Sequence, residues 1–286
     1  MIMESERFEI SEAPMRIGTV RLNVRDLDAV AGFYRDVLGL VPLTAGDGSV
    51  TLGAGERPLL HLDGDPMLAP RDSRQAGLFH TAFLMSRRDL ACWLGHVTEA
   101  RVPLQGASDH LVSEAIYLAD PEGNGIEVYA DRAPSHWRDR SGAIRMKTDP
   151  LDLENLMQAA GAARWAGFPP DGAIGHVHLQ VGDLEEADRF YRDALGLDVA
   201  ARYPGASFYG SGGYHHQLAG NVWNSRHAGP RSEGMAGLGT VELVLRDPAG
   251  LRRTAERASR VGSGIESGED GIRLRDPWGT TIALTA

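Results

Sequence analysis

Alternating apolar and polar residues predict a strand, then a helix, then further strands near the start of the chain. Val20, Leu22 and Val24 alternate with polar residues, which is the period of a half-buried strand. The next segment has apolar residues at helical spacing, namely Val30, Phe33, Tyr34 and Val37. Asp26 is placed to cap the N-terminus of this helix, and Gly39 is placed to end it.

The same pattern returns later in the chain. Residues 20–27 and 33–40 recur as residues 177–184 and 190–197. Both copies lie at the same offset of 157 residues (177 − 20 and 190 − 33), which indicates a duplication. Two weaker copies open near residues 77 and 237. The chain therefore contains four strand–helix–strands units.

These units define the predicted organisation of the chain, which is of the α+β class. We place the units at 16–64, 76–131, 173–224 and 236–286. The first two form a predicted domain over 16–131, and the last two form a second over 173–286. The stretch 132–172 is rich in prolines and charges and is predicted to be a linker. Residues 1–15 are predicted to be a mobile arm.

Composition and charge narrow the class of protein. The chain has 286 residues and a net charge of −10, so a nucleic-acid partner is not expected. The N-terminus lacks an apolar signal core, and no apolar run approaches the ~18 residues of a membrane span. We expect a cytoplasmic protein with no membrane partner. The single cysteine, Cys92, excludes a disulfide framework and is expected to be a buried apolar residue.

Residues 110–127 hold the most informative side chains. His110, Tyr117 and Glu127 surround a tight Asp-Pro-x-Gly turn, and His80 lies in an earlier strand. Two histidines and one carboxylate are what a mononuclear non-heme metal site needs if substrate and O₂ are to share the metal. Glu127 alternates with apolar neighbours, so it faces away from them, where a lone carboxylate is costly unless it is paired or metal-bound. A surface strand glutamate is the alternative interpretation.

The repeats resemble the vicinal oxygen chelate (glyoxalase/bleomycin resistance/dioxygenase) superfamily. Its units open with Asp-Leu followed by Phe-Tyr-x-x-x-Leu-Gly-Leu, as residues 26–40 do here. The resemblance covers nearly the whole chain after about residue 16. It implies that four βαβββ modules form two half-barrel domains. The opening repeat supports this fold and not a particular reaction.

Within that superfamily, the chain is similar to the catechol 2,3-dioxygenase-like, extradiol ring-cleaving branch. Residues 110–127 match its signature: His, five residues, an apolar residue and Tyr, two residues, Asp-Pro-x-Gly, then Glu. Ser108 departs from that signature, which usually has Gly, Asn, Thr or an aliphatic residue there. The departure removes no functional group.

The resemblance also implies a set of metal ligands. It places ligands at His80 and Glu127, and takes the third from the first strand of a partner unit. That position is Thr19 in unit one, which is a poor ligand, and His176 in unit three. Unit four has threonine and alanine in place of His80 and Glu127. We therefore expect units two and three to build one site, within one chain or across a domain-swapped pair, and units one and four to pair as a structural half.

Four further residues complete the candidate site. The signature implies an acid–base role for His110 and Tyr117 near the substrate hydroxyl. A His-His pair in this family places one histidine over the O₂ position; we favour His216 and keep His215 as the alternate. His178 faces the same way as His176 and either supports the ligands or forms part of the pocket wall.

These residues lead to the hypothesis of an extradiol dioxygenase that cleaves a catechol-like ortho-dihydroxy aromatic with O₂, in aromatic catabolism. The expected cofactor is Fe(II), with Mn(II) as the alternative. A glyoxalase-like isomerase or metal-dependent transferase is a second hypothesis, although such sites commonly use two carboxylates. A metal-free protein that binds an aromatic compound is a third. The oligomeric state is left open, and a homo-oligomer is compatible with such modules.

Overall fold

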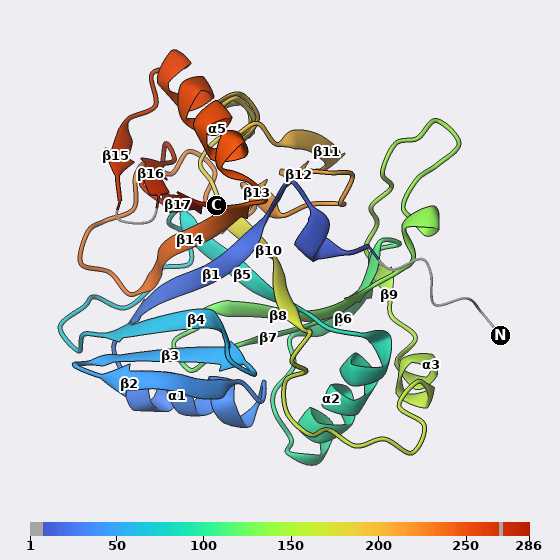
Figure 1. The fold of residues 1–286 in the computed structure, drawn as a ribbon. Helices are drawn as coiled ribbons and strands as arrows, with labels where there is room; N and C mark the ends of the chain where they lie inside the picture. Colours follow the sequence, from blue (N-terminus) through green and yellow to red (C-terminus); the bar gives the residue numbers. More distant parts are fainter. Residues whose placement is uncertain (1–7, 269–270) are drawn as a thin grey trace.

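The computed structural model describes residues 8–268 and 271–286 and consists of two curved sheets with helices packed against them (Figure 1). The first sheet has the order β15 (Ile265–Ser267), β16 (Gly271–Arg275), β17 (Thr281–Thr285), β14 (Gly237–Leu245), β1 (Met15–Val24), β4 (Arg57–Gly64), β3 (Ser49–Ala54), β2 (Val41–Gly46). The second has the order β11 (Asp198–Tyr203), β12 (Ala206–Gly210), β13 (Leu218–Asn221), β10 (Ala173–Gln180), β5 (Gly77–Leu84), β8 (Gly125–Asp131), β7 (Ser113–Ala119), β6 (Gly106–Asp109), β9 (Asp149–Pro150).

The described residues contain five α-helices. They are α1 (Leu27–Asp36), α2 (Arg87–Glu99), α3 (Leu153–Gln158), α4 (Leu184–Asp188) and α5 (Pro248–Arg260). Helix α1 packs on β3 and β4 and α5 on β14 and β17, whereas α2 packs on β8 of the second sheet. A π-helical segment, Arg189–Ala194, continues α4. No helix in the described part of the chain is long and apolar enough to cross a membrane.

Each sheet joins one unit from each half of the chain. β1 pairs antiparallel with β14, so units one and four share the first sheet. β10 pairs antiparallel with β5, so units two and three share the second sheet (Figure 1). The half-barrels therefore do not follow the predicted division into 16–131 and 173–286, because each of those halves contributes one unit to each sheet.

Local sequence signals explain where the first helix of each half starts and stops. Asp26 accepts a hydrogen bond from the backbone N–H of Ala29, and Asp183 accepts one from Glu186. Gly39 and Gly196 have φ angles of +73° and +82° after the two helical segments. This left-handed conformation is favourable for glycine and strained for most other residues, so these positions end the helices.

One continuous apolar core lies between the sheets and their helices. Leu22 of β1, Phe83 of β5 and Trp93 of α2 are all fully buried in it. Trp93 also donates a hydrogen bond from Nε1 to the carbonyl of Val37, which fixes α2 against the end of α1. Cys92 is buried, as the sequence predicts, and burial raises the pKa of its thiol.

The segment before β1 is packed where the structure describes it. Residues 1–7 of the predicted arm lie outside the described residues. The ring of Phe8 packs at a tilt against Trp137 and Tyr214, with ring centroids 5.7 and 4.9 Å apart, and Ala13 is buried. Residues 8–14 therefore cover part of the second sheet and are not a free arm.

The connection over 132–172 is also part of the folded body. Trp137, Leu156 and Phe168 are buried, and α3 packs on α2. The two residues of β9 extend the second sheet beside β6. The proline and charge content of this stretch predicts a linker but does not reveal that its apolar residues anchor it to both sheets.

Gly125, which lies opposite His80 in the β5–β8 pairing, provides a test of how closely these strands approach. A Cβ added at Gly125 would lie 2.0 Å from the carbonyl oxygen of Phe79, which is backbone and cannot rotate away. We expect Gly125→Ala to lower the free energy of unfolding by about 1–3 kcal/mol. Gly95→Ala is the matched control, since a Cβ there meets nothing within 4 Å on helix α2 and should stabilise the fold by roughly 0.5–1 kcal/mol. Chemical denaturation of both variants measures the difference, and equal stabilities would contradict the close approach.

Candidate metal centre and its pocket

Four neighbouring strands of the second sheet place a row of side chains on one concave face. His176 of β10 is in register with Ala82 of β5, Ala82 with Glu127 of β8, and Glu127 with Tyr117 of β7. His80 precedes Ala82 by two residues and shares its face. Because Ala82 is small, the side chains of His176 and Glu127 can approach each other across it.

His80, Glu127 and His176 form a compact buried group. Glu127 Oε2 lies 2.9 Å from His80 Nε2 and 3.3 Å from His176 Nε2. One ligand atom from each residue lies within 4.8 Å of the other two, and the three residues are between 2 and 6% exposed. His80 Nε2 makes no hydrogen bond despite its proximity to the carboxylate. Two imidazole nitrogens and a carboxylate oxygen that converge in this way fit a divalent cation.

The protonation states of His176 and Glu127 suit the binding of a cation. Burial lowers the pKa of His176 to about 4, so its ring is neutral at pH 7. Burial alone would raise the pKa of Glu127, but the adjacent His176 and His80 outweigh it and hold this pKa well below its usual range. An ionised carboxylate and a neutral imidazole have lone pairs available for a metal.

Two further histidines line the same cavity with unpaired nitrogens. Burial, together with the neighbouring imidazoles, holds the pKa of His178 and of His216 well below its usual value. Nε2 of each ring is buried and has no hydrogen-bond partner. A buried polar atom without a partner costs roughly 1–3 kcal/mol, so these nitrogens are oriented for something that binds in the cavity.

The cavity beside this group has a volume of about 250 Å³. Its walls include aromatic and connecting residues that the sequence did not single out: Phe79, Met146, Lys147, Thr148, Tyr203, Phe208 and Trp223. His178 makes ring contacts with Phe79, Phe208 and Trp223, which places it in the aromatic wall rather than among the converging ligand atoms. A cavity of this size and composition suits a small aromatic molecule.

His110 and Tyr117 are hydrogen-bonded to each other where they line this cavity. His110 Nε2 lies 2.6 Å from the Tyr117 hydroxyl, and its Nδ1 lies 2.6 Å from the carbonyl oxygen of Lys147. A carbonyl can only accept, so Nδ1 carries the proton and Nε2 of the neutral ring accepts from Tyr117. Burial and the nearby Glu127 raise the pKa of Tyr117 well above its usual value, so the hydroxyl keeps its proton.

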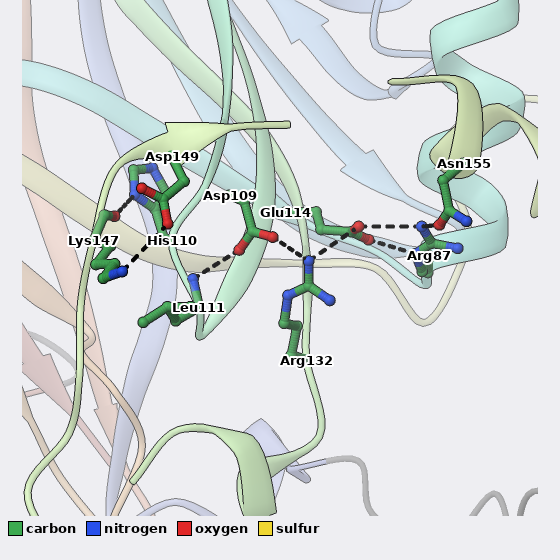
Figure 2. A network of polar contacts seen from close by, with 9 residues as sticks. All are labelled: Arg87, Asp109, His110, Leu111, Glu114, Arg132, Lys147, Asp149 and Asn155. Atoms are coloured by element: carbon green, nitrogen blue, oxygen red, sulfur yellow. Dashed lines mark hydrogen bonds and ion pairs between the residues drawn. The ribbon is translucent and has the colours of Figure 1, made fainter. Parts of the chain in front are cut away.

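A polar network fixes the turn that holds His110, as Figure 2 shows. The backbone N–H of Leu111 donates to Asp109 Oδ1 at 2.9 Å, and the guanidinium of Arg132 bridges Asp109 and Glu114. Glu114 in turn pairs with Arg87 at the start of α2. These contacts tie the His110 turn to β8 and α2, so the imidazole is held by rigid elements.

The two adjacent histidines after β12 have different surroundings. His216 lines the cavity, and its ring centroid lies 4.1 Å from that of His176. His215 is fully buried behind it and bonds Asp131 Oδ1 at 2.8 Å. Of the two, His216 is the one whose ring faces the cavity.

Comparison with known proteins gives the relationship of this chain. The family model for the glyoxalase/bleomycin resistance protein/dioxygenase superfamily matches residues 16–128 and 173–284. The chain belongs to this superfamily. It is 41% identical over 267 residues to a catechol-2,3-dioxygenase from Bacillus subtilis. The alignment covers 91% of this chain and 93% of the relative.

Solved structures of other superfamily members share the fold. A putative dioxygenase from Bacillus subtilis aligns with a TM-score of 0.65 at 14% identity, over 95% of this chain and 85% of that one. Glyoxalase I from Zea mays aligns with a TM-score of 0.55 at 16% identity, over 94% of this chain and 92% of that one. At these identities the likeness concerns the fold alone.

The first sheet of this superfamily member has a cavity but not a similar group of ligands. A space of about 540 Å³ lies over the equivalent face, where Thr19, Thr240 and Ala283 occupy the register positions of His176, His80 and Glu127. Within residues 8–268 and 271–286, His80, Glu127 and His176 form the one group of metal-ligating side chains close enough to hold an ion. The described residues therefore contain one candidate metal centre, in the second sheet.

Acid should destabilise the metal-free protein through these buried rings. The pKa of His176 falls from its ordinary 6.5 to about 4 on folding, so between these pH values the unfolded chain binds a proton that the folded chain does not. Stability is unaffected above pH 6.5 and falls as the pH drops toward 4. For His176 alone we expect about 2 kcal/mol less stability at pH 5 than at pH 7. Denaturation of chelator-treated protein at several pH values measures this, and a flat profile between pH 7 and 5 would contradict it.

Proposed function

We propose that this protein is an extradiol-type dioxygenase that opens the ring of a small catechol-like ortho-dihydroxy aromatic with O₂. The observation that carries the proposal is the buried meeting of His80, His176 and Glu127 beside a cavity lined by aromatic rings. The 41% identity to a catechol-2,3-dioxygenase supports it. We propose His80, His176 and Glu127 as metal ligands.

Iron(II) is the proposed metal, with manganese(II) as the alternative. When bound, the metal supplies a centre at which an ortho-diol and O₂ can meet and exchange electrons. Two neutral imidazoles and one carboxylate compensate one of its two charges. The remaining positive charge favours a substrate that binds as an anion. Phe79, Phe208 and Trp223 provide apolar surface for its ring.

His110, Tyr117 and His216 are the proposed acid–base residues. The Tyr117 hydroxyl keeps its proton and donates a hydrogen bond to His110 Nε2, so the two residues form one unit that can hold a substrate hydroxyl and take up or return a proton. His216 approaches the cavity from the other side, near His176, with Nε2 unpaired. His215 lies behind it and is not proposed to touch substrate.

The carboxylate content of the cavity favours this reaction over a glyoxalase-like isomerisation or transfer. Glu127 is the one acidic residue among the described residues that line it. A general base in the form of a second carboxylate, common in those isomerases and transferases, is not found along this wall. The proposal therefore assigns proton transfer to histidine and tyrosine.

Anaerobic purification followed by metal analysis and O₂ uptake with catechol tests the proposal. We expect one metal ion per chain, consumption of one O₂ per catechol and a yellow ring-opened semialdehyde. Reconstitution of chelator-treated protein with Fe(II) or Mn(II) in turn decides between the two metals. Metal-loaded protein that consumes no O₂ with a panel of substituted catechols would refute the assignment.

A further inference from the structure

A chain of hydrogen bonds runs from Asp131 to the cavity through both adjacent histidines. Asp131 Oδ1 lies 2.8 Å from His215 Nε2, and His215 Nδ1 lies 2.8 Å from His216 Nδ1. The last atom of this chain, His216 Nε2, is buried and has no partner in the protein. Asp131 is the last residue of β8, four residues after Glu127 on the same strand.

The direction of each bond follows from its acceptor. An ionised carboxylate can only accept, so His215 Nε2 carries a proton. A neutral imidazole has one N–H, so Nδ1 of a neutral His215 has a lone pair and accepts from His216 Nδ1–H. The proton of a neutral His216 is then on Nδ1. Its Nε2 is left with a lone pair beside the cavity.

Close contacts hold His215 in place. The side chain is fully buried, and its ring centroid lies 4.1 Å from Tyr214 and 5.0 Å from Trp137. Asp131 also accepts a hydrogen bond on its other oxygen from the Tyr214 hydroxyl at 3.0 Å. A charged His215 would add a proton on Nδ1 and reverse the bond to His216.

We propose that Asp131 and His215 are positioning residues that fix the tautomer of His216, so that its Nε2 faces the cavity as a proton acceptor. The dependence on a carboxylate is the one seen in Ser-His-Asp triads, where an aspartate sets the imidazole tautomer without taking the proton itself. Its consequence for catalysis rests on the proposed function. His216 would accept a proton from the bound diol at Nε2 and could not donate one to it in the resting state.

Histidine ring ¹⁵N NMR of the metal-free protein tests the tautomer directly. Long-range ¹H–¹⁵N correlations separate protonated from unprotonated ring nitrogens, and His216→Gln assigns the signals. At pH 7–8 we expect His216 to be protonated on Nδ1 and His215 on Nε2. Protonation of His216 on Nε2 in the wild-type protein overturns the proposal and requires no variant to fold.

Asp131→Leu tests the cause of the tautomer, since it removes the acceptor and nearly keeps the shape. We expect His216 to populate both tautomers in this variant. In the metal-loaded protein kcat should fall by roughly 10-fold or more with little change in KM, because the wrong tautomer binds the substrate but cannot accept its proton. An unchanged His216 tautomer in Asp131→Leu would show that the carboxylate does not set it.

Tyr214→Phe is the matched control. It removes the other hydrogen bond to Asp131 and leaves the Asp131–His215–His216 chain in place. We expect the wild-type tautomer and a kcat within about 2-fold of wild type. The NMR readout uses metal-free protein, so it is independent of activity. If the protein consumes no O₂ but His216 has the expected tautomer, the proposed function is wrong and this inference still holds.

Discussion

His80→Ala is expected to abolish metal binding and to lower ring-cleaving activity by roughly 10³-fold or more. His80 is one of three converging ligand residues, and its Nε2 is directed at Glu127 without a hydrogen bond. Without this nitrogen, Glu127 and His176 remain as two ligands, which leaves a much weaker site for a divalent cation. Metal analysis of the purified variant and O₂ uptake with catechol measure the two losses.

Thr240→Ala is the matched control for this variant. Thr240 of β14 holds the register position in the first sheet that His80 holds in the second, and it lines the other cavity. We expect full metal content and activity within about 2-fold of wild type. Loss of metal in Thr240→Ala, or retained metal and activity in His80→Ala, would contradict a single site in the second sheet.

The pairing of units illustrates what residue chemistry can add to periodicity. The alternating pattern at Val20–Val24 and the Asp26 cap predict the elements of a unit because these effects act within a few residues. They do not say which units pair. The contrast between Thr19 in unit one and His176 in unit three predicts the pairing, because metal ligands must lie close together to bind one ion. It led to units two and three, which share the second sheet.

Other parts of the site could not be predicted because they depend on contacts between distant segments. The partner of His110 Nδ1 is the carbonyl oxygen of Lys147, and a backbone carbonyl has no signature in the sequence. Phe208 in the middle of β12 and Trp223, which follows β13, line the cavity from positions that are set by the whole sheet. Asp131 is the last residue of its strand, a common place for a surface aspartate, and only its bond to His215 distinguishes it.

The N-terminal segment and the connection over 132–172 differ from their predictions for a similar reason. Phe8, Trp137 and Phe168 are isolated apolar residues in polar or proline-containing stretches, so they have no helical or strand period. Trp137 and Phe168 are buried, and Phe8 is partly buried, against surfaces that the rest of the fold creates. A single apolar residue can anchor a loop, and its burial cannot be predicted until that surface is known.

Tyr117→Phe is expected to lower kcat by roughly 10²-fold while the metal stays bound. The variant keeps the ring and removes the hydroxyl that donates to His110 Nε2 at 2.6 Å. His110 then loses the partner that connects it to the substrate hydroxyl, and proton transfer by a positioned group is worth roughly 10²–10⁴-fold. Steady-state kinetics of the metal-loaded variant, with metal content measured on the same sample, give the effect.

A double-mutant cycle with His110→Gln separates a shared role from two independent ones. Tyr117 and His110 form one hydrogen-bonded unit, so the double variant should be about as slow as the slower single variant and not as slow as the product of both effects. Burial and Glu127 raise the pKa of Tyr117 well above its usual value, so wild-type kcat/KM should show no alkaline decline from ionised Tyr117 below pH 9. Additive losses in the cycle would mean that the two residues act separately, and the short contact between them would then be structural.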